Sequence, residues 1–449
     1  MTRSAGEGAR LGKQSAGYLP EADTRPRSLA IAEAIIIGAG PAGLSLALRL
    51  HQTTNITPII YELRPEPTTL GGAVGIPSNG LRLLDRLGVY KPLLNLASSA
   101  SDLTVYSITG NVLGRYDDLV ADARKETGYG YMRVKRVELV DALLAAIREA
   151  GIAVHFGKKV TEIREGEDRV HVAFEDGSSD SADILLGCDG IHSAVRKIYV
   201  DPEQNPEYTG LAGLFSLIPA LNLSPSAVEQ IRGLNTTLTE EGMFLVAPCT
   251  ANKDEVFWGF QRETPMPNNR DARDGWELHG RKEVDEFKKT LHGVLQNATG
   301  DWGNTLRALV DQTSVMKFYP VYRLPLGGPW SRGRCLLLGD AAHAMQPHAS
   351  QGVSMALEDS FLIARLLADR SRGVVEACEA FCRIRRPRVE EIYHAAAQNA
   401  GIRKKTGPWG LWVKENFIRL SFYLPFGMKV GGAAFGKGVT GYDIDEEAL

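Results

Sequence analysis

Three side chains that could bind a metal ion or move a proton lie in one short stretch of the sequence. The segment GDAAHAMQPHASQG, residues 339–352, contains Asp340, His343 and His348. A carboxylate and two imidazoles could bind zinc, and histidine is also a common general acid or base. The two histidines are five residues apart, which places them on different sides of a helix, and no second cluster of ligands accompanies them. We therefore expect no metal here, and the rest of the chain must decide between a catalytic segment and the wall of a pocket.

A second segment, GAGPAG at residues 38–43, has the glycine spacing of a dinucleotide-binding turn. In such a turn Gly38 allows the chain to turn off a strand, Gly40 lets the backbone approach a pyrophosphate, and Gly43 lets the helix pack closely on the strand. The helix N-terminus then offers N–H groups to the phosphates. Glu62 follows Gly43 by nineteen residues, at the end of the next predicted strand, where a carboxylate can bind ribose hydroxyls. This pattern predicts a dinucleotide site, for either FAD or NAD.

The elements around these motifs indicate an α/β fold with an insertion. An apolar strand over residues 34–37 leads through the glycines into a helix. Buried strands also precede GCDGIHSAVR (residues 187–196) and the 339–352 segment, and an amphipathic helix is predicted over 136–151. Residues from about 205 to 320 instead contain strands among longer polar loops. We expect the two ends to form one domain into which the β-rich middle is inserted.

GAGPAG, CDGIHSAVR and GDAAHAMQPHASQG occur in the order of three motifs of the class A flavoprotein monooxygenases. The chain resembles the para-hydroxybenzoate hydroxylase-like family, which has a GxGxxG motif near the N-terminus, a DG motif in the middle and a GD motif late in the chain. The resemblance extends over about residues 34–388 and includes the segments YMRVKRVEL and FCRIRRPRV. The aromatic C-terminal tail and its GYD ending are most similar to the fungal secondary-metabolite branch.

The resemblance implies a doubly wound FAD-binding domain that carries the three motifs, with an inserted antiparallel β-sheet domain for the substrate. The first 30 residues contain Gly, Ser, Arg and Pro without an apolar run, which is typical of a disordered tail. The expected division is this tail (1–30), the first part of the FAD-binding domain (31–204), the substrate sheet (205–320), the second part of the FAD-binding domain (321–400) and a C-terminal aromatic cap (401–449).

The resemblance also implies FAD as the cofactor, with NADPH as a transient electron donor. The residues that it assigns to the ribitol and flavin are Asp340, Pro347, Gly352, Val353 and the loop from Gly72 to Gly75. The residues assigned to the rest of the dinucleotide are Gly38, Gly40, Gly43, Glu62 and Arg136. Asp189 of the DG motif would support the binding of both FAD and NADPH. His343 and His348 would be wall or packing residues rather than ligands.

Two features depart from the family pattern. Ser350 and Ser354 stand where the family usually has glycine and where asparagine or glycine is common. The segment GLFSLIPA, residues 213–220, has no arginine or tyrosine pair that could hold a phenolate, which argues against a simple phenol as substrate. The expected substrate wall is aromatic and is drawn from Phe215, Phe244, Trp258 and Phe260, and no general base is assigned.

By resemblance, NAD(P)H reduces FAD, and a flavin C4a-hydroperoxide then hydroxylates or epoxidises an apolar or aromatic small molecule. Two alternatives stay open. One is an FAD-dependent oxidoreductase or cyclase on the same fold that does not insert oxygen, and the other is a non-catalytic flavin-binding module.

Composition narrows the remaining possibilities. The formal net charge of -3 argues against a nucleic-acid partner. The five scattered cysteines argue against a disulfide framework or a zinc site and favour a reducing compartment, the cytoplasm. The basic cluster CRIRRPR, residues 382–388, is expected to be a solvated helix face, with a docking patch for a phosphate-bearing cofactor as the alternative.

The stretch from residue 409 to residue 436 is apolar and aromatic but is interrupted by charged residues and a proline, so it is not expected to span a membrane. We expect it to pack over the body of the protein. A contact with a membrane surface and one wall of an apolar cavity are the alternatives.

Overall fold

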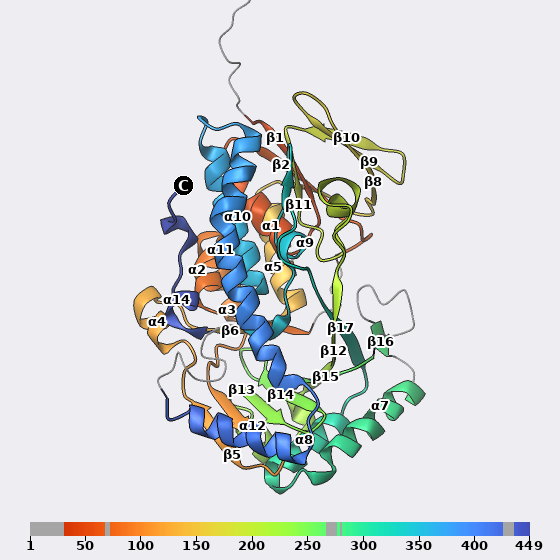
Figure 1. Cartoon of the computed structure of the whole chain (residues 1–449), viewed down its shortest axis with the longest axis vertical. Coiled ribbons are helices and arrows are strands. Elements are labelled where there is room, and N and C mark those ends of the chain that lie inside the picture. The colour runs from red at the N-terminus through yellow and green to blue at the C-terminus, as the bar shows by residue number, and fades with distance from the viewer. Residues whose placement is uncertain (1–30, 68–71, 266–275, 279–280, 425–434) are drawn as a thin grey trace, which may run out of the picture.

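The computed structural model describes residues 31–67, 72–265, 276–278, 281–424 and 435–449. The predicted tail, residues 1–30, lies outside these ranges. The chain builds an elongated molecule with a parallel sheet and its helices at one end and a second, larger sheet at the other (Figure 1). Two long strands of the second sheet, β12 (Glu207–Pro219) and β17 (Met316–Arg323), lead from one part to the other.

The first sheet has six strands in the order β18-β19-β11-β1-β2-β7. Its central strands pair in parallel, as a doubly wound fold requires, and only β18 and β19 pair antiparallel. The central strand β1 is buried from Ala34 to Ile37, which explains its uninterrupted apolar sequence. The strand bounds are β1 (Glu33–Ile37), β2 (Thr57–Tyr61), β7 (Ala153–His155), β11 (Ile184–Gly187), β18 (Ser331–Arg332) and β19 (Cys335–Leu337).

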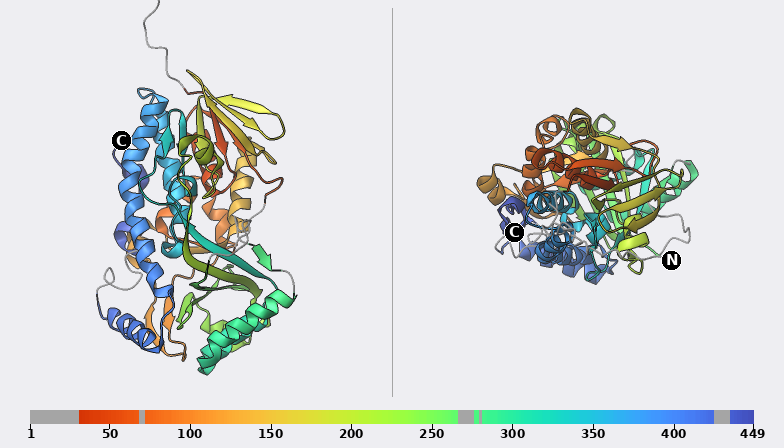
Figure 2. Two further views of the ribbon diagram at one scale, coloured as in Figure 1. Left: turned by 45° about the vertical axis from the view of Figure 1, so that its right-hand side comes forward. Right: turned by 90° about the horizontal axis from the view of Figure 1, so that it is seen from above.

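Helices cover this sheet, and α1 packs between two of them, α5 and α10. The long helix α11 packs on α10 and runs along one side of the molecule toward the second sheet (Figure 2). Two small antiparallel sheets, β8–β10 and β3 with β6, complete this part. The bounds are α1 (Pro41–Thr53), α2 (Ser78–Arg86), α3 (Tyr90–Leu94), α4 (Ala121–Thr127), α5 (Arg136–Glu149), α9 (Asp340–His343), α10 (Gly352–Ala368), α11 (Val374–Ala400), β3 (Ala73–Ile76), β6 (Met132–Lys135), β8 (Val160–Glu165), β9 (Val170–Phe174) and β10 (Ser179–Ala182).

The second sheet has eight strands in the order β16-β17-β12-β15-β14-β13-β4-β5. All pairs are antiparallel except β13 with β4. Strands β4 and β5 come from residues 103–116, which the predicted division places in the first part of the FAD-binding domain. That assignment is corrected here, because these residues complete the edge of the second sheet. The bounds of the strands not yet given are β4 (Leu103–Tyr106), β5 (Val112–Tyr116), β13 (Leu234–Leu238), β14 (Gly242–Pro248), β15 (Glu255–Glu263) and β16 (Trp276–Leu278).

The two faces of the second sheet have different surroundings. Even-numbered residues of β12, such as Leu214 and Ile218, belong to a hydrophobic core shared with helix α8 (Gly300–Asp311). Since side chains alternate along a strand, odd-numbered residues such as Phe215 lie on the opposite face. Helix α7 (Arg281–Val294) also lies on the core side, because Phe287 packs against this cluster.

The C-terminal stretch forms helix α12 (Pro408–Ser421), which packs on β5 at the far end of the second sheet. Leu411 and Ile418 are buried there, whereas Trp409, Trp412 and Phe417 are exposed. Residues 425–434 of the predicted cap lie outside the described ranges. In the described part of the chain, no helix combines the length and the apolar character needed to cross a membrane.

Candidate cofactor and substrate site

The glycine turn after β1 has one glycine for each structural constraint that the sequence predicts. Gly38 has a φ of +105°, and a Cβ there would lie 2.5 Å from the carbonyl oxygen of Cys188. A Cβ on Gly43 would lie 2.0 Å from the carbonyl oxygen of Gly38, so only glycine lets the helix approach the strand. A Cβ on Gly40 would meet nothing within 4 Å. Gly40 therefore borders open space at the N-terminus of α1, where a pyrophosphate would need room.

Glu62 joins the end of β2 to this turn. Its carboxylate accepts hydrogen bonds from the N–H of Ala39, at 2.8 Å, and from the N–H of Arg64, at 2.9 Å. Each carboxylate oxygen has a second lone pair, so capacity for ribose hydroxyls remains. The structure thus brings Glu62 beside the glycine turn, although the two are far apart along the chain.

Asp340 lies in a recess of the protein rather than on an open surface. Its side chain is accessible, yet the surrounding protein raises the pKa of its carboxyl by burial, an effect that Arg136 opposes. A side chain that is accessible and also surrounded by protein lies in a recess. Gly352 and Pro347 are accessible as well, and a Cβ on Gly352 would meet nothing within 4 Å. Open space therefore extends along the GD segment to the N-terminus of α10.

The loop at Gly72 connects this space to the second sheet. The N–H of Arg136 donates to the carbonyl oxygen of Gly72 at 2.9 Å. A Cβ on Gly72 would lie 2.7 Å from Phe257 and 3.1 Å from Phe215. A Cβ on Gly75 would lie 1.9 Å from the hydroxyl of Tyr131. The loop therefore passes directly against the odd-numbered face of β12 and β15.

Asp189 follows β11 and caps the turn after it. Its Oδ2 accepts hydrogen bonds from the N–H groups of Ala194, at 2.6 Å, and Val195, at 3.2 Å. Its Oδ1 is buried and has no partner in the described part of the chain. Burial raises the pKa of this carboxyl. This acceptor lies next to the glycine turn, which contacts Cys188. A bound dinucleotide could supply the hydrogen-bond donor that Oδ1 lacks.

His343 has a structural partner. Its Nε2 lies 2.7 Å from Oδ2 of Asp359, and the same oxygen accepts the N–H of Gly339 at 2.8 Å. His348 lies in the short turn η4 (Pro347–Ala349) and is buried without a partner for its Nε2 among the described residues. Across the described ranges, no three His, Cys, Asp or Glu side chains gather as a metal site would require.

The basic cluster at residues 382–388 is not the solvated face that the sequence predicts, and this prediction is wrong. Arg385 is completely buried, with Nε 2.8 Å from Asp359 and Nη1 2.9 Å from Glu358. Arg388 is also buried and lies 3.2 Å from Glu358. Nor does the cluster offer Arg385 to a phosphate, because both of its acid partners come from α10. Only Arg383 of the four arginines is exposed.

This buried network reaches the N-terminus of α10 through a residue that the sequence analysis did not select. Asn79 on α2 donates its amide to Glu358 at 2.8 Å and to Gln351 at 2.9 Å. Gln351 directly precedes α10 and is therefore held in place beside the open space at Gly352. The pairing of Glu358-Asp359 with an arginine-rich helix was the available signal, because acids on an otherwise apolar helix need partners.

The two serines that depart from the family pattern occupy tight positions. Ser350 has a φ of +53°, a left-handed conformation that favours glycine. Ser354 is buried against α2, where a Cβ on Gly80 would lie 2.4 Å from its hydroxyl oxygen. The loop thus keeps the backbone shape that glycine usually provides, at a cost in strain of about 1–2 kcal/mol.

Only one of the four aromatic residues expected in the substrate wall lies on the sheet face that meets the Gly72 loop. Phe215 faces Gly72 and packs near Phe257, with ring centroids 5.9 Å apart. Phe244, Trp258 and Phe260 are buried in the core on the opposite face of the sheet. The indole of Trp258 donates to Thr313 at 3.0 Å, as a core residue would. These three assignments are corrected, because strand alternation turns them toward α8.

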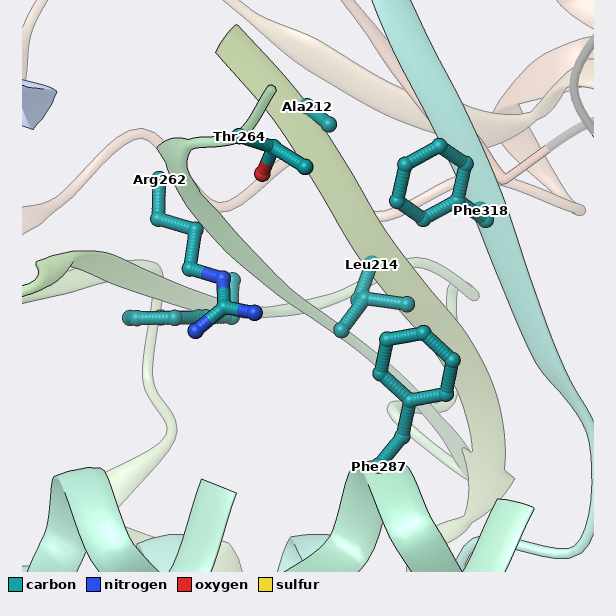
Figure 3. A pocket seen from close by; sticks show the side chains of 7 residues that line it. Ala212, Leu214, Arg262, Thr264, Phe287 and Phe318 are labelled. Carbon is teal, nitrogen blue, oxygen red and sulfur yellow. The ribbon is translucent and has the colours of Figure 1, made fainter. Parts of the chain in front are cut away.

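Phe260 does border a small cavity, but on that same core side. The cavity has a volume of about 140 Å³, and Figure 3 shows Leu214, Phe287 and Phe318 around it. Leu214 and Phe318 are even-numbered and point away from Gly72. This cavity is therefore separate from the space beside Asp340.

A doubly wound sheet with a glycine turn and open space at two helix N-termini is the architecture of a dinucleotide-binding oxidoreductase. The family described as "FAD binding domain" matches residues 32–396. The 6-hydroxynicotinate 3-monooxygenase of Pseudomonas fluorescens is 30% identical over 338 residues, which cover 74% of this chain and 82% of that protein. The salicylate hydroxylase of Pseudomonas putida is 28% identical over 374 residues, covering 79% and 82%.

Solved structures agree on the fold. The crystal structure of Klebsiella pneumoniae HpxO complexed with FAD and uric acid aligns with a TM-score of 0.76 at 23% identity, covering 91% of this chain and 97% of that one. The chain belongs to the class A FAD-dependent monooxygenase family. It is an oxidoreductase, and its cofactor is FAD.

Proposed function

We propose that this enzyme uses NAD(P)H and molecular oxygen to hydroxylate or epoxidise an apolar or aromatic small molecule. One observation carries the proposal. The Gly72 loop, tied to Arg136, touches Phe215 and Phe257 on the accessible face of the second sheet. A substrate on that face would lie between aromatic side chains and the space that Asp340 and Gly352 border.

Within this proposal, the residues around the space hold FAD. Gly40 and the N-terminus of α1 take the pyrophosphate, and Glu62 takes the adenosine ribose. Asp340 binds the ribitol, Arg136 contacts the dinucleotide, and Asp189 supports the turn beneath it. Pro347, Gly352 and Val353 lie along the flavin, where the positive end of α10 favours negative charge on the ring.

These positions give the cofactor and the protein different roles. Bound FAD supplies the redox chemistry, which is to accept a hydride and to activate oxygen. The protein orients the substrate ring and excludes water with apolar side chains from the second sheet. The chain has one glycine fingerprint, so the nicotinamide nucleotide binds transiently without a Rossmann domain of its own.

The names of the relatives support an aromatic ring as the substrate class. They describe enzymes of 6-hydroxynicotinate, salicylate and, in Pseudomonas aeruginosa, 2-heptyl-3-hydroxy-4(1H)-quinolone. The relatives named here are bacterial, so the fungal secondary-metabolite branch stays a prediction, as do the cytoplasmic location and the role in biosynthesis.

The test is the visible absorption spectrum of the purified protein before and after anaerobic addition of NADPH or NADH. A flavin spectrum that bleaches supports the reductive step. Oxygen uptake without release of hydrogen peroxide, together with a product that has gained one oxygen atom, then supports the insertion step. Turnover without oxygen uptake would instead support an oxidoreductase or cyclase, and failure of reduction with every ligand would support a flavin-binding module.

The exposed face of helix α12 supports a second proposal, a contact with a membrane surface. Its exposed face carries Trp409, Trp412 and Phe417, and Tyr423 follows it with 84% of its surface exposed. Aromatic residues beside cations such as Arg419 are typical of segments that lie at a membrane surface. We propose that this face touches an anionic membrane. Sedimentation with phosphatidylcholine–phosphatidylserine vesicles should fall in the double variant Trp412→Ser/Phe417→Ser, and a wild-type protein that does not sediment with them would contradict the proposal.

A further inference from the structure

Arg403 is an enclosed cation that has no acidic partner among the residues that the structure describes. It lies in the turn η5 (Gly401–Arg403) directly after α11. Its Nη1 donates to the carbonyl oxygen of Asn399 at 2.5 Å. Its Nε is buried and has no hydrogen-bond partner within the described residues, and Arg403 forms no ion pair with any carboxylate there. A guanidinium normally satisfies several of its five N–H groups, so this one has unused donors.

The surroundings of Arg403 place it between the GD segment and the second sheet. The turn η5 packs against β14 and β15. On its other side, Asn399 donates its amide to the carbonyl oxygen of His348 at 3.1 Å, which ties this end of α11 to the turn after Asp340. Arg403 therefore lies beside the segment that we assign to the flavin and beside two strands of the substrate sheet.

Arg403, like Asp340, is accessible and yet surrounded by protein. Its side chain is partly accessible, yet burial lowers the pKa of its guanidinium to about 10. The group is still protonated at neutral pH. A partly accessible side chain that is nevertheless surrounded by protein lies in a recess rather than on an open surface.

His348, the neighbouring titratable residue, does not neutralise the positive charge of Arg403. His348 is only 7% exposed, and its Nε2 is buried without a partner in the part of the chain that the structure describes. Burial and then the charge of Arg403 lower the pKa of His348 well below its ordinary value. The imidazole is therefore neutral and leaves the positive charge of Arg403 uncompensated.

An enclosed cation without a nearby counter-charge is costly, and an anion that binds beside it recovers part of that cost. We propose, on the basis of the proposed monooxygenase function, that Arg403 binds an oxyanion of the aromatic substrate, either a carboxylate or an ionised hydroxyl. The two strands beside it offer an apolar surface for the ring, because Leu245 of β14 and Phe257 of β15 lie on the face opposite the core, as does Phe215 of the neighbouring strand β12. Arg403 thus sets the orientation of the substrate, because it holds the end of the ring that carries the oxyanion.

The experiment compares matched anionic and neutral ligands on the FAD-loaded enzyme. Benzoate with benzamide and 2-naphthoate with 2-naphthamide test the carboxylate, and pentafluorophenol with pentafluorobenzene tests the ionised hydroxyl. Binding is followed by the change in flavin absorption. Wild-type enzyme should prefer the anionic member of at least one pair by about tenfold, the effect of a hydrogen bond to a charged group. Arg403→Gln should abolish this preference, and Arg403→Lys should keep part of it.

Lys404→Gln is the matched control, because it removes one positive charge from the adjacent, exposed position and should leave the preference unchanged. Removal of an uncompensated charge should also leave the melting temperature of Arg403→Gln unchanged or raised, whereas a structural arginine would lower it. No preference for the anion in any wild-type pair, or a preference that survives Arg403→Gln, overturns the proposal. If NADPH still bleaches the flavin in that case, the oxyanion site has failed and the proposed reductive step has not.

Discussion

Arg385 of α11 places its Nε 2.8 Å from Oδ1 of Asp359 on α10, and both side chains are completely buried. Although burial opposes it, His343 and Arg385 hold the pKa of Asp359 below its ordinary value. The other oxygen of this carboxylate accepts the N–H of Gly339, the first residue of the GD segment. One carboxylate therefore fixes a helix–helix contact and the start of the cofactor loop together.

Asp359→Asn should strongly destabilise the protein. The substitution leaves the buried charge of Arg385 without one of its two acids, and breaking a buried pair in this way costs about 3–5 kcal/mol. Urea unfolding measures the loss. Glu379→Gln is the control, because Glu379 is an exposed acid on α11 and should change stability by less than about 0.5 kcal/mol. Equal stability of the two variants would show that the buried network contributes little.

Gly40→Ala and Gly43→Ala should separate cofactor binding from folding. A methyl group at Gly40 meets no protein atom, so the apoprotein should keep its melting temperature while FAD binding weakens about tenfold, since crowding by one methyl costs roughly 1–3 kcal/mol. A methyl group at Gly43 collides with the backbone of Gly38, so that apoprotein should lose stability. Thermal melts without FAD and fluorescence titration with FAD measure the two effects. Unchanged FAD affinity in Gly40→Ala would remove the pyrophosphate from this turn.

Phe215→Ala and Phe244→Ala should differ because the two rings lie on opposite faces of one sheet. Phe244 is 1% exposed in the core, so its truncation should cost about 3–5 kcal/mol of unfolding free energy. Phe215 is only partly buried and faces Gly72, so its truncation should cost less stability but raise KM and the fraction of NADPH oxidised without product. Denaturation curves and the ratio of product to NADPH test this. A normal ratio in Phe215→Ala would place the substrate elsewhere.

The contact between the C-terminal segment and α2 should lose stability in acid. Asp443 pairs with Arg86 and lies 2.9 Å from Arg82. Burial raises the pKa of Asp443, but these arginines lower it to about 2, below the ordinary 3.8. Because the folded-state pKa lies below the unfolded value, the pair contributes fully above about pH 3.8 and is lost as the pH falls toward 2.

Asp443→Asn should therefore be less stable than wild type at pH 6, and the difference should shrink steadily as the pH is lowered from 4 toward about 2. Urea unfolding at several pH values measures it. Asp117→Asn, which removes an exposed partner of Arg115, is the control and should show no such dependence. A difference that stays constant with pH would assign the effect of Asp443 to packing rather than to its charge.

Local sequence patterns were sufficient for the parts of the site that depend on the backbone. The spacing of Gly38, Gly40 and Gly43 predicts a turn because only glycine tolerates those contacts, and the structure has the collisions that require it at Gly38 and Gly43. The apolar residues 34–37 predict a buried strand, because a strand buried on both faces has an uninterrupted apolar sequence. The three ordered motifs predict the family and FAD, and the comparisons confirm both.

Long-range pairing decided what the local pattern could not. Arg385 looks like a solvent-facing residue when only its charged neighbours are considered, because its acids lie on another helix, α10. Strands β4 and β5 are separated from the rest of the second sheet by about a hundred residues of other structure, so only chain topology shows where they pair.

The alternation of side chains between the two faces of β12 and β15 can be read from the sequence, since the period of a strand is fixed by its backbone. The choice of the face that meets the Gly72 loop depends on tertiary packing. Helix α8 packs against Leu214 and Trp258, so the even-numbered residues face the core. Phe215 and Phe257 therefore lie toward Gly72. A strand pattern cannot carry this information, because two apolar faces look alike until a helix covers one of them.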